Sequence, residues 1–223
     1  MIFYTADTHF GYLPIIYATA RPFADTDEMD AVLIANWNQT VSPEDTVYIV
    51  GDFAYNKGEI PSVYFEKLNG HKHLIRGNHD ASLDHQEDFF RYCESVTDLL
   101  EIDDNGSHVI LCHYPMVHNK KSYMIHGHVH NRRGPGYDIL KTLPHVLNAG
   151  VDINFFKPVT LEQLIRNNEL FYSDRCDEYF INPDKVREQE DPSVREIIYS
   201  WRNEHFRPVN CKTPDFRPLP VKP

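Results

Sequence analysis

The chain has 223 residues, a formal net charge of -11, and ordinary shares of hydrophobic (41%) and charged (25%) residues. A chain of this length forms one domain with a good core and has room for an appendage. The acidic balance argues against a general binder of long nucleic acid or anionic membranes, because both require a basic surface. It leaves open a small phosphate ester, since bound metal ions would dominate the field around them.

The first half of the chain alternates strand-like and helix-like segments. Three apolar segments predict buried strands: 1–6, 46–50 and 71–75. Capping residues and apolar spacing predict helices at 25–39, 61–68 and 87–92. Residues 10–24 are expected to form a loop that returns past the strand ends.

The second half contains short strands in close succession. Strands are predicted at 96–102, 108–112, 123–125 and 145–148. Residues 103–106 predict a hairpin turn, and 132–136 a loop. Thr160 and Gln163 have the spacing of a capping box, which opens a helix to about Leu170. Together these segments predict an α/β fold, layered and with mixed sheets.

From residue 171 onward the chain becomes rich in proline. One helix is predicted at 192–201, with Asp191 as its cap. We therefore expect a main domain over 1–170 and an extension over 171–223. The extension should pack on the core and be extended or disordered at its end.

Cysteine usage and hydropathy favour an intracellular chain. The cysteines form no Cys-x-x-Cys pair and are expected to be reduced thiols: Cys93, Cys112, Cys176 and Cys211. No apolar run approaches the ~18 residues of a membrane span, and no signal peptide is recognisable. We expect a cytoplasmic protein that binds no membrane, and the sequence leaves the oligomeric state open.

Oxygen and imidazole donors follow five of the predicted strands. These donors are Asp7, His9, Asp52, Asn78, His113, His128 and His130. Ligands of open α/β sheets gather beyond the carboxyl ends of the strands. Asp7 and His9 would also share a face if the chain there is extended. The sequence therefore predicts a metal site at the strand ends, in preference to a chance set of surface and turn residues.

The spacing of these motifs resembles that of the calcineurin-like metallophosphoesterase superfamily. Its motifs Asp-x-His, Gly-Asp, Gly-Asn-His, His and Gly-His-x-His stand in order at Asp7, Gly51, Gly77, His113 and Gly127. The resemblance covers roughly residues 1–170 and is to small stand-alone phosphoesterases of bacteria and phages. It implies an α/β/β/α sandwich. The arginine of the phosphoprotein phosphatase motif is missing after Gly51-Asp52, which disfavours a phosphoprotein substrate.

The resemblance also implies which residues hold metal. Asp7, His9 and His130 would hold one ion. Asn78, His113 and His128 would hold a second, and Asp52 would bridge the two. Two divalent transition-metal ions are expected, with manganese first and iron, zinc, nickel or cobalt as alternatives, because imidazole and carboxylate donors suit these metals.

The implied reaction is hydrolysis of a phosphodiester or small phosphate ester. A metal-bridging hydroxide would attack phosphorus in line, and His79 would protonate the leaving oxygen. Asp80 would fix the tautomer of His79, or would instead cap a turn. The open alternatives are a nuclease or cyclic-nucleotide phosphodiesterase, and a non-catalytic protein-binding module on the same fold.

Some neighbouring residues have weaker assignments. Arg132, Arg133 and Arg21 are candidates to grip the substrate phosphate, with solvated loop positions as the alternative. His126 is expected to be structural, and Tyr114 to shape the backbone behind His113.

Overall fold

The protein contains two sheets, each of four strands. The structure is a computed structural model, and it describes residues 1–54, 61–80, 86–117, 121–183, 207–209 and 213–215. The first sheet is parallel throughout, in the order β1-β2-β3-β4. Its strands are β1 (Ile2–Thr5), β2 (Thr46–Ile49), β3 (His71–Ile75) and β4 (Ser95–Thr97).

The second sheet is mixed and has the order β5-β6-β7-β8. Its strands are β5 (Leu99–Asp104), β6 (Ser107–Cys112), β7 (Tyr123–His126) and β8 (Val146–Asn148). The β5–β6 pair is an antiparallel hairpin, and the other pairs are parallel. Its turn has positive φ at Asn105 and Gly106, as a tight hairpin turn requires.

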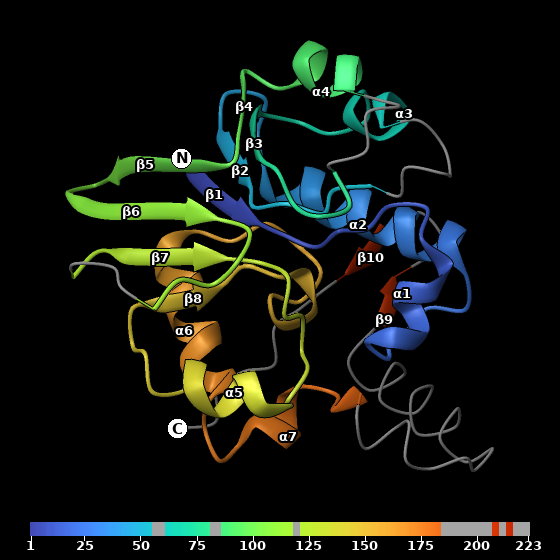
Figure 1. Cartoon of the computed structure of the whole chain (residues 1–223). Coiled ribbons are helices and arrows are strands. Elements are labelled where there is room, and N and C mark those ends of the chain that lie inside the picture. The colour runs from blue at the N-terminus through green and yellow to red at the C-terminus, as the bar shows by residue number, and fades with distance from the viewer. Residues whose placement is uncertain (55–60, 81–85, 118–120, 184–206, 210–212, 216–223) are drawn as a thin grey trace.

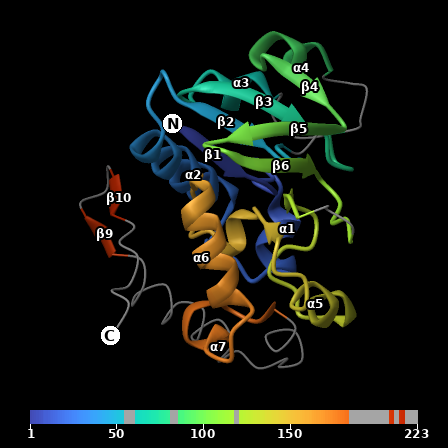
Figure 2. The same ribbon diagram turned by 90° about the vertical axis from the view of Figure 1, so that its left-hand side faces the viewer.

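The two sheets stack face to face and helices cover their outer faces (Figures 1 and 2). Alternate residues of β1 serve the two faces: Phe3 packs in the helix-covered core with Trp37, and Tyr4 packs between the sheets with Leu111 and Ile125. The helices on the first sheet are α1 (Leu13–Ala18), α2 (Thr26–Thr40), α3 (Ser62–Phe65) and α4 (Gln86–Tyr92). The structure thus confirms the predicted layered α/β fold.

Helices α5 (Pro135–Leu140) and α6 (Leu161–Phe171) belong to the second sheet's side of the molecule. Leu140 packs with Met124 and Val146 on the outer face of that sheet. Helix α6 begins with the predicted capping box, in which the Thr160 side chain accepts from the Gln163 N–H and the Gln163 side chain accepts from the Thr160 N–H. A 3-10 helix, η2 (Val151–Ile153), lies between β8 and α6 in the chain.

Three predictions of secondary structure were wrong in detail. The single strand predicted at 96–102 is divided at Asp98 into β4 and β5, which belong to different sheets. The loop predicted at 10–24 contains α1, and the loop predicted at 132–136 runs into α5, whose first residue is Pro135. Both helices are only six residues long, so periodicity gives little signal.

The expected boundary at residue 170 falls inside α6. Phe171 is buried together with Ile153, Cys176 and Phe180, and a further helix, α7 (Cys176–Tyr179), follows. The start of the expected extension is therefore part of the core. Strands β9 (Arg207–Val209) and β10 (Thr213–Asp215) pair antiparallel, and the helix predicted at 192–201 lies outside the described residues.

Among the described residues, none of the helices combines the length and apolar character that crossing a bilayer requires. Cys93, Cys112 and Cys176 are free thiols, as expected, and Cys211 lies outside the described residues.

Candidate metal centre

The seven predicted metal ligands all follow the carboxyl ends of strands, and the two sheets bring them to one edge. Asp7 and His9 follow β1, Asp52 follows β2, and Asn78 follows β3; His113 follows β6, and His128 and His130 follow β7. Parallel strands present these ends at the same side of each sheet, and the stacking of the sheets brings the two sets together.

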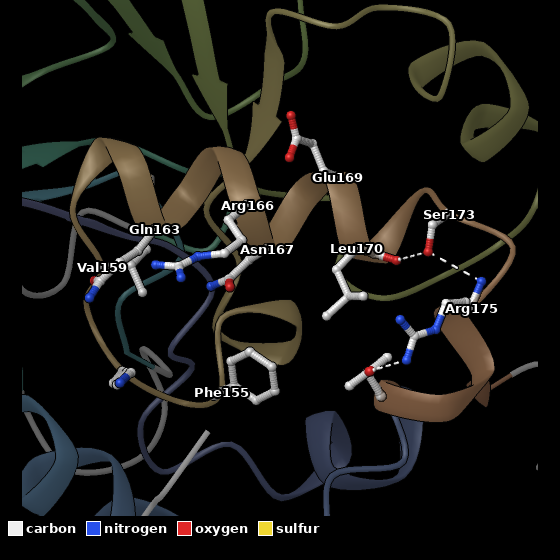
Figure 3. A pocket seen from close by; sticks show the side chains of 11 residues that line it. Phe155, Val159, Gln163, Arg166, Asn167, Glu169, Leu170, Ser173 and Arg175 are labelled. Carbon is white, nitrogen blue, oxygen red and sulfur yellow. Dashed lines mark hydrogen bonds between the residues drawn. The ribbon is translucent and has the colours of Figure 1, made fainter. Parts of the chain in front are cut away.

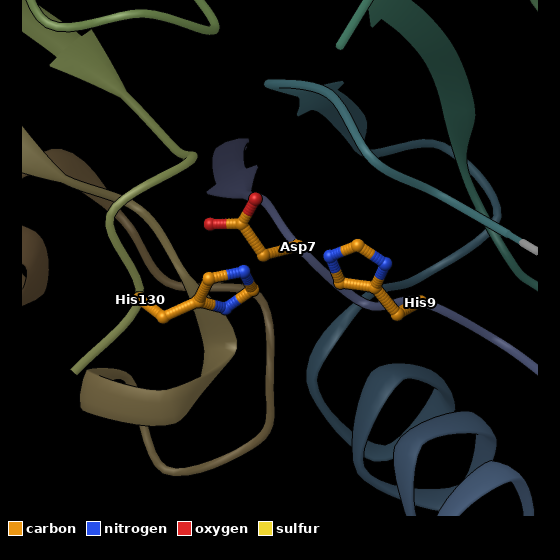
Figure 4. A group of neighbouring side chains, drawn as sticks. All are labelled: Asp7, His9 and His130. Carbon is orange, nitrogen blue, oxygen red and sulfur yellow. The ribbon is translucent and has the colours of Figure 1, made fainter. Parts of the chain in front are cut away.

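One group of donors consists of Asp7, His9 and His130. Each offers a ligand atom within 4.8 Å of the others, and Figure 4 shows the three side chains facing one another. The Oδ2 atom of Asp7 and both ring nitrogens of His9 are buried without a hydrogen-bond partner. Buried polar atoms are rarely left unpaired, because desolvation is costly. A bound cation would satisfy Asp7 Oδ2 and one ring nitrogen of His9, so the residues fit a metal ion.

Asp52 lies between this group and a second one. Its Oδ2 atom is 3.5 Å from His9 Nε2 and also 3.5 Å from His113 Nε2. Asp52 forms one potential ligand group with His9 and His79, and another with Asp7 and His113. A carboxylate in this position can contact two ions at once.

The other donors surround the side-chain oxygen of Asn78. Asn78 Oδ1 is 3.1 Å from His113 Nε2 and 2.9 Å from His128 Nδ1. His113 Nδ1 donates to the Val50 carbonyl oxygen at 2.9 Å, which leaves the Nε2 lone pair for a ligand. Asn78 and His128 are exposed, whereas Asp7 and His9 are buried. The centre therefore opens to solvent on the side of Asn78 and His128.

The backbone at the centre departs from the extended conformation that the sequence suggested for Asp7 and His9. Five of the seven predicted ligands have positive φ values: Asp7 (57°), His9 (50°), Asp52 (55°), His128 (72°) and His130 (53°). This conformation is uncommon for residues other than glycine and clusters at functional sites. The two side chains converge because the chain bends sharply, not because it alternates as a strand does.

Two glycines allow the strand ends to approach each other. A Cβ atom at Gly51, which has a φ of +89°, would lie 2.3 Å from His113 Nδ1. At Gly77 it would lie 2.2 Å from Asp52 Oδ1. Any larger residue at either position would displace a predicted ligand.

Asp80 organises the backbone and does not orient His79. Its carboxylate accepts hydrogen bonds from the backbone N–H groups of Asp52 (2.6 Å), Phe53 (2.9 Å) and Gly77 (2.8 Å). The catalytic assignment of Asp80 was therefore wrong, and its alternative as a turn cap was closer. The position of His79 is fixed through its backbone N–H, which donates to Asp52 Oδ1 at 2.8 Å.

Arg21 does not face a substrate. Its side chain is fully buried, and its Nε atom donates to Asp152 Oδ1 at 2.8 Å. It also donates to the carbonyl oxygens of Asp7 (2.7 Å) and Thr8 (2.9 Å), directly behind the centre. The expectation that Arg21 grips phosphate was therefore wrong, because its guanidinium is buried and bonded to Asp7, Thr8 and Asp152.

Asp152 is the functional residue that sequence reasoning missed. Its Oδ2 atom accepts from His130 Nδ1 at 2.9 Å, which leaves Nε2 of His130 as the free ring nitrogen. Carboxylates in this position orient metal-binding histidines and raise their basicity. Burial would raise the pKa of Asp152, but the charges of Arg21 and His130 lower it well below its usual range. No motif of the sequence marks Asp152, which lies 22 residues after His130.

The remaining predicted residues have mixed positions. Arg133 pairs with Asp177 and donates to the Phe180 carbonyl oxygen, so it ties the loop to α7, and its assignment to substrate stays a prediction. Arg132 is exposed and stays a prediction. His126 is buried and bonds the Gly127 carbonyl oxygen at 2.8 Å, in keeping with a structural role.

Two tyrosines flank the centre. The ring of Tyr114 is 4.8 Å from that of His128 and the residue is 49% exposed. Tyr12 lies 5.7 Å, between ring centroids, from both His9 and His79. Tyr114 therefore offers an exposed aromatic surface beside the open edge of the centre, beyond the backbone role expected for it.

Charge coupling is strong at the centre. Burial would lower the pKa of His113, but the neighbouring carboxylates of Asp52 and Asp7 outweigh it and raise the pKa to about 9. Burial raises the pKa of Asp7, against the opposing effect of His130 and His113. The Asp52 carboxylate, whose own pKa is lowered by His113, thus holds positive charge in place, as a cation-binding centre does.

Comparisons with known proteins agree with this geometry. The family model described as calcineurin-like phosphoesterase matches residues 1–217. An uncharacterized protein of Methanocaldococcus jannaschii (MJ1445) is 33% identical over 170 residues, covering 74% of this chain and 89% of the relative. The gene 66 protein of Mycobacterium phage L5 is 30% identical over 160 residues, covering 57% of this chain and 76% of the relative.

A solved structure of similar fold is that of the Aquifex aeolicus protein AQ665, of unknown function. It has a TM-score of 0.59 and 26% identity, and the match covers 74% of this chain and 98% of that one. The chain belongs to the calcineurin-like phosphoesterase family, and it is a hydrolase of phosphoric esters. The family match reaches beyond the residues 1–170 over which the motifs were recognised.

Proposed function

We propose that the protein hydrolyses a phosphodiester or a small phosphate ester at a centre of two divalent ions. The observation that carries this proposal is the position of Asp52, whose Oδ2 atom is 3.5 Å from the Nε2 atoms of both His9 and His113. Asp7 and His130 complete the donor set on one side of Asp52, and Asn78 and His128 on the other. Imidazole, carboxylate and amide donors suit manganese, iron, zinc, nickel or cobalt, and we propose manganese first.

Two divalent ions bound there would polarise the phosphoryl oxygens and make hydroxide available at neutral pH. The chain itself supplies position and protons. Asp152 and Val50 fix the ring orientations of His130 and His113. Such preorganised groups need no rearrangement as charge develops on phosphorus.

His79 is the proposed general acid. Its backbone N–H donates to Asp52 Oδ1, and its ring centroid lies 5.0 Å from that of His9. Its side chain is part-exposed, so it can reach a leaving oxygen on the open side of the centre. A positioned acid typically contributes 10²–10⁴-fold to the rate. His79 also offers a ring nitrogen within 4.8 Å of ligand atoms of His9 and Asp52, which places it against the centre.

A nucleotide diester is the second candidate substrate. Tyr114 is exposed beside His128, and an aromatic ring at this position can stack on a base or another aryl group. The net charge of -11 weighs against long nucleic acid. We further propose that the protein acts in the cytoplasm.

The test is turnover of bis(p-nitrophenyl) phosphate and p-nitrophenyl phosphate by protein that has been chelated and reloaded with Mn²⁺. His79→Ala should lose turnover by roughly 100-fold or more while keeping its metal. His108→Ala is the matched control, because His108 is exposed on β6 and pairs with the exposed Glu101 of β5. Full turnover by His79→Ala, or no turnover of either ester by the metal-loaded protein, would refute the proposal.

A further inference from the structure

A second cavity lies away from the metal centre, between α6 and the segment that follows η2. Its volume is about 430 Å³, within the roughly 300–1,000 Å³ of small-molecule sites. Figure 3 shows Phe155 and Leu170 facing each other across it, with Arg166 and Asn167 on one side and Arg175 on the other. The middle of the cavity is therefore apolar and its ends are polar.

Two cations that line the cavity have no carboxylate partner among the described residues. Lys157 and Arg166 both line the cavity, and neither forms an ion pair within the part of the chain that the structure describes. Lys157 is partly buried, and this burial lowers the pKa of its amine with no carboxylate to oppose the shift. Partial burial disfavours the charged form of a lysine that has no carboxylate beside it, so an anion placed beside Lys157 would be favoured.

The other charges lining the cavity do not neutralise this end. Arg175 is paired with Glu178 at 2.9 Å. Glu169 is the one carboxylate among the described lining residues, and Figure 3 shows it pointing away from Phe155 and Leu170. On a protein of net charge -11, two cations without a carboxylate partner among the described residues form a locally positive region.

The cavity is separate from the metal centre, although the two share a stretch of backbone. Asn167, in the cavity wall, donates to Asn154 Oδ1 at 3.0 Å. Asn154 in turn donates to the carbonyl oxygens of Asn148 and Gly150. This network holds the wall rigid between η2 and α6, which favours a preformed site over a surface depression.

We propose that this cavity binds a small organic anion. Its carboxylate or sulfonate group would lie against Lys157 and Arg166, and its apolar body between Phe155 and Leu170. Charge-assisted hydrogen bonds fix the head group, and burial of the apolar body supplies the rest of the affinity. The site differs in residues and in chemistry from the phosphoesterase centre, so it does not depend on the proposed function.

The test uses 8-anilinonaphthalene-1-sulfonate as the probe, with the full-length, metal-loaded protein saturated with inorganic phosphate. Fluorescence titration should show one saturable site per chain, unaffected by the phosphate. Lys157→Met should raise its dissociation constant by about tenfold, the loss expected for one charged hydrogen bond. The matched control is Lys67→Met, because Lys67 is an exposed lysine just after α3, away from the cavity.

A neutral analogue of the probe, N-phenyl-1-naphthylamine, should bind at least about tenfold more weakly if the head group is recognised. Three results would overturn the proposal: no saturable binding, equal binding by Lys157→Met and the unaltered protein, or displacement of the probe by inorganic phosphate. The last result would place the probe at the metal centre.

Discussion

Asp152 shows how a predicted ligand depends on a side chain that would never touch an ion. It accepts from His130 Nδ1 at 2.9 Å and from Arg21 Nε at 2.8 Å. Arg21 also binds the carbonyl oxygens of Asp7 and Thr8. One buried ion pair therefore fixes both the ring of His130 and the backbone that presents Asp7.

We predict that Asp152→Asn weakens metal binding. The amide cannot accept from His130 and Arg21 as the carboxylate does, so His130 loses its fixed orientation, and such losses typically cost 10–100-fold in metal affinity. Calorimetric titration with Mn²⁺ measures the effect. Asp174→Asn, at a fully exposed acid, is the control. Unchanged affinity in a folded Asp152→Asn protein would contradict the positioning role.

We also predict that metal affinity rises with pH. The carboxylates of Asp52 and Asp7 outweigh burial and raise the pKa of His113 to about 9 in the metal-free protein. Because a metal ligand must be a neutral imidazole, binding below pH 9 releases this proton. The Mn²⁺ affinity should then increase up to about tenfold per pH unit between pH 6 and 8. Competition titrations against a chelator of known pH dependence would detect it, and a flat profile would count against this coupling.

At the residue scale, the sequence predicted the metal-ligand candidates better than it predicted the residues that orient them. Asp7, His9 and Asp52 follow apolar runs, so the chain itself marks them. The ion-pair partner of Arg21 could not be predicted from the sequence, because Asp152 lies 131 residues away and belongs to no motif. Long-range ion pairs depend on tertiary packing, which periodicity does not encode.

The strand ends are the elements that bring the centre together, and glycine sets how closely they approach. A Cβ atom at Gly77 would lie 2.2 Å from Asp52 Oδ1 and 2.6 Å from Asp52 N. β3 and β2 can therefore deliver Asn78 and Asp52 side by side only when residue 77 has no side chain.

We predict that Gly77→Ala displaces Asp52 and lowers the metal content of the protein. Overpacking of this kind also costs about 1–3 kcal/mol of stability. Gly134→Ala is the matched control, since a Cβ atom there meets nothing within 4 Å and φ is -76°. Metal content by mass spectrometry and urea unfolding give the two readouts. Full metal content in the Gly77→Ala protein would contradict this prediction, because it would show that the strand ends can accommodate a Cβ atom at residue 77.

The predicted elements were most accurate where a local pattern was strong. The capping box at Thr160 and the β-branched run of β2 both stand where expected. The division at Asp98 was missed because no local signal tells a strand which of two sheets it will join. Helices α1 and α5 were missed because each has only six residues.

At the scale of the whole molecule, the core extends further along the chain than the composition suggested. Phe171 is 1% exposed and packs with Ile153, Cys176 and Phe180. Ile153 ends η2, the turn that contains Asp152. The segment after residue 170 therefore supports the backbone behind the metal centre. The sequence did not predict this, because the proline-rich composition was taken over the whole of residues 171–223, and it does not distinguish the buried start of this segment from the rest.

We predict that Phe171→Ala destabilises the protein by about 3–5 kcal/mol, as loss of a buried phenyl ring usually does. Phe90→Ala, at a residue that is 61% exposed on α4, should change stability by no more than about 0.5 kcal/mol. Urea unfolding of both variants provides the comparison. Equal stability of the two variants would contradict this prediction and would support the predicted domain boundary at residue 170.

The central claim is that Asp52 joins two metal ions in one centre, and metal stoichiometry tests it most directly. Protein that has been chelated, reloaded with Mn²⁺ and freed of excess metal should contain two ions per chain by mass spectrometry. Asp52→Asn should contain one or none, because its Oδ2 atom is 3.5 Å from the Nε2 atoms of both His9 and His113. Two ions retained by Asp52→Asn, or a single ion in the unaltered protein, would contradict the account.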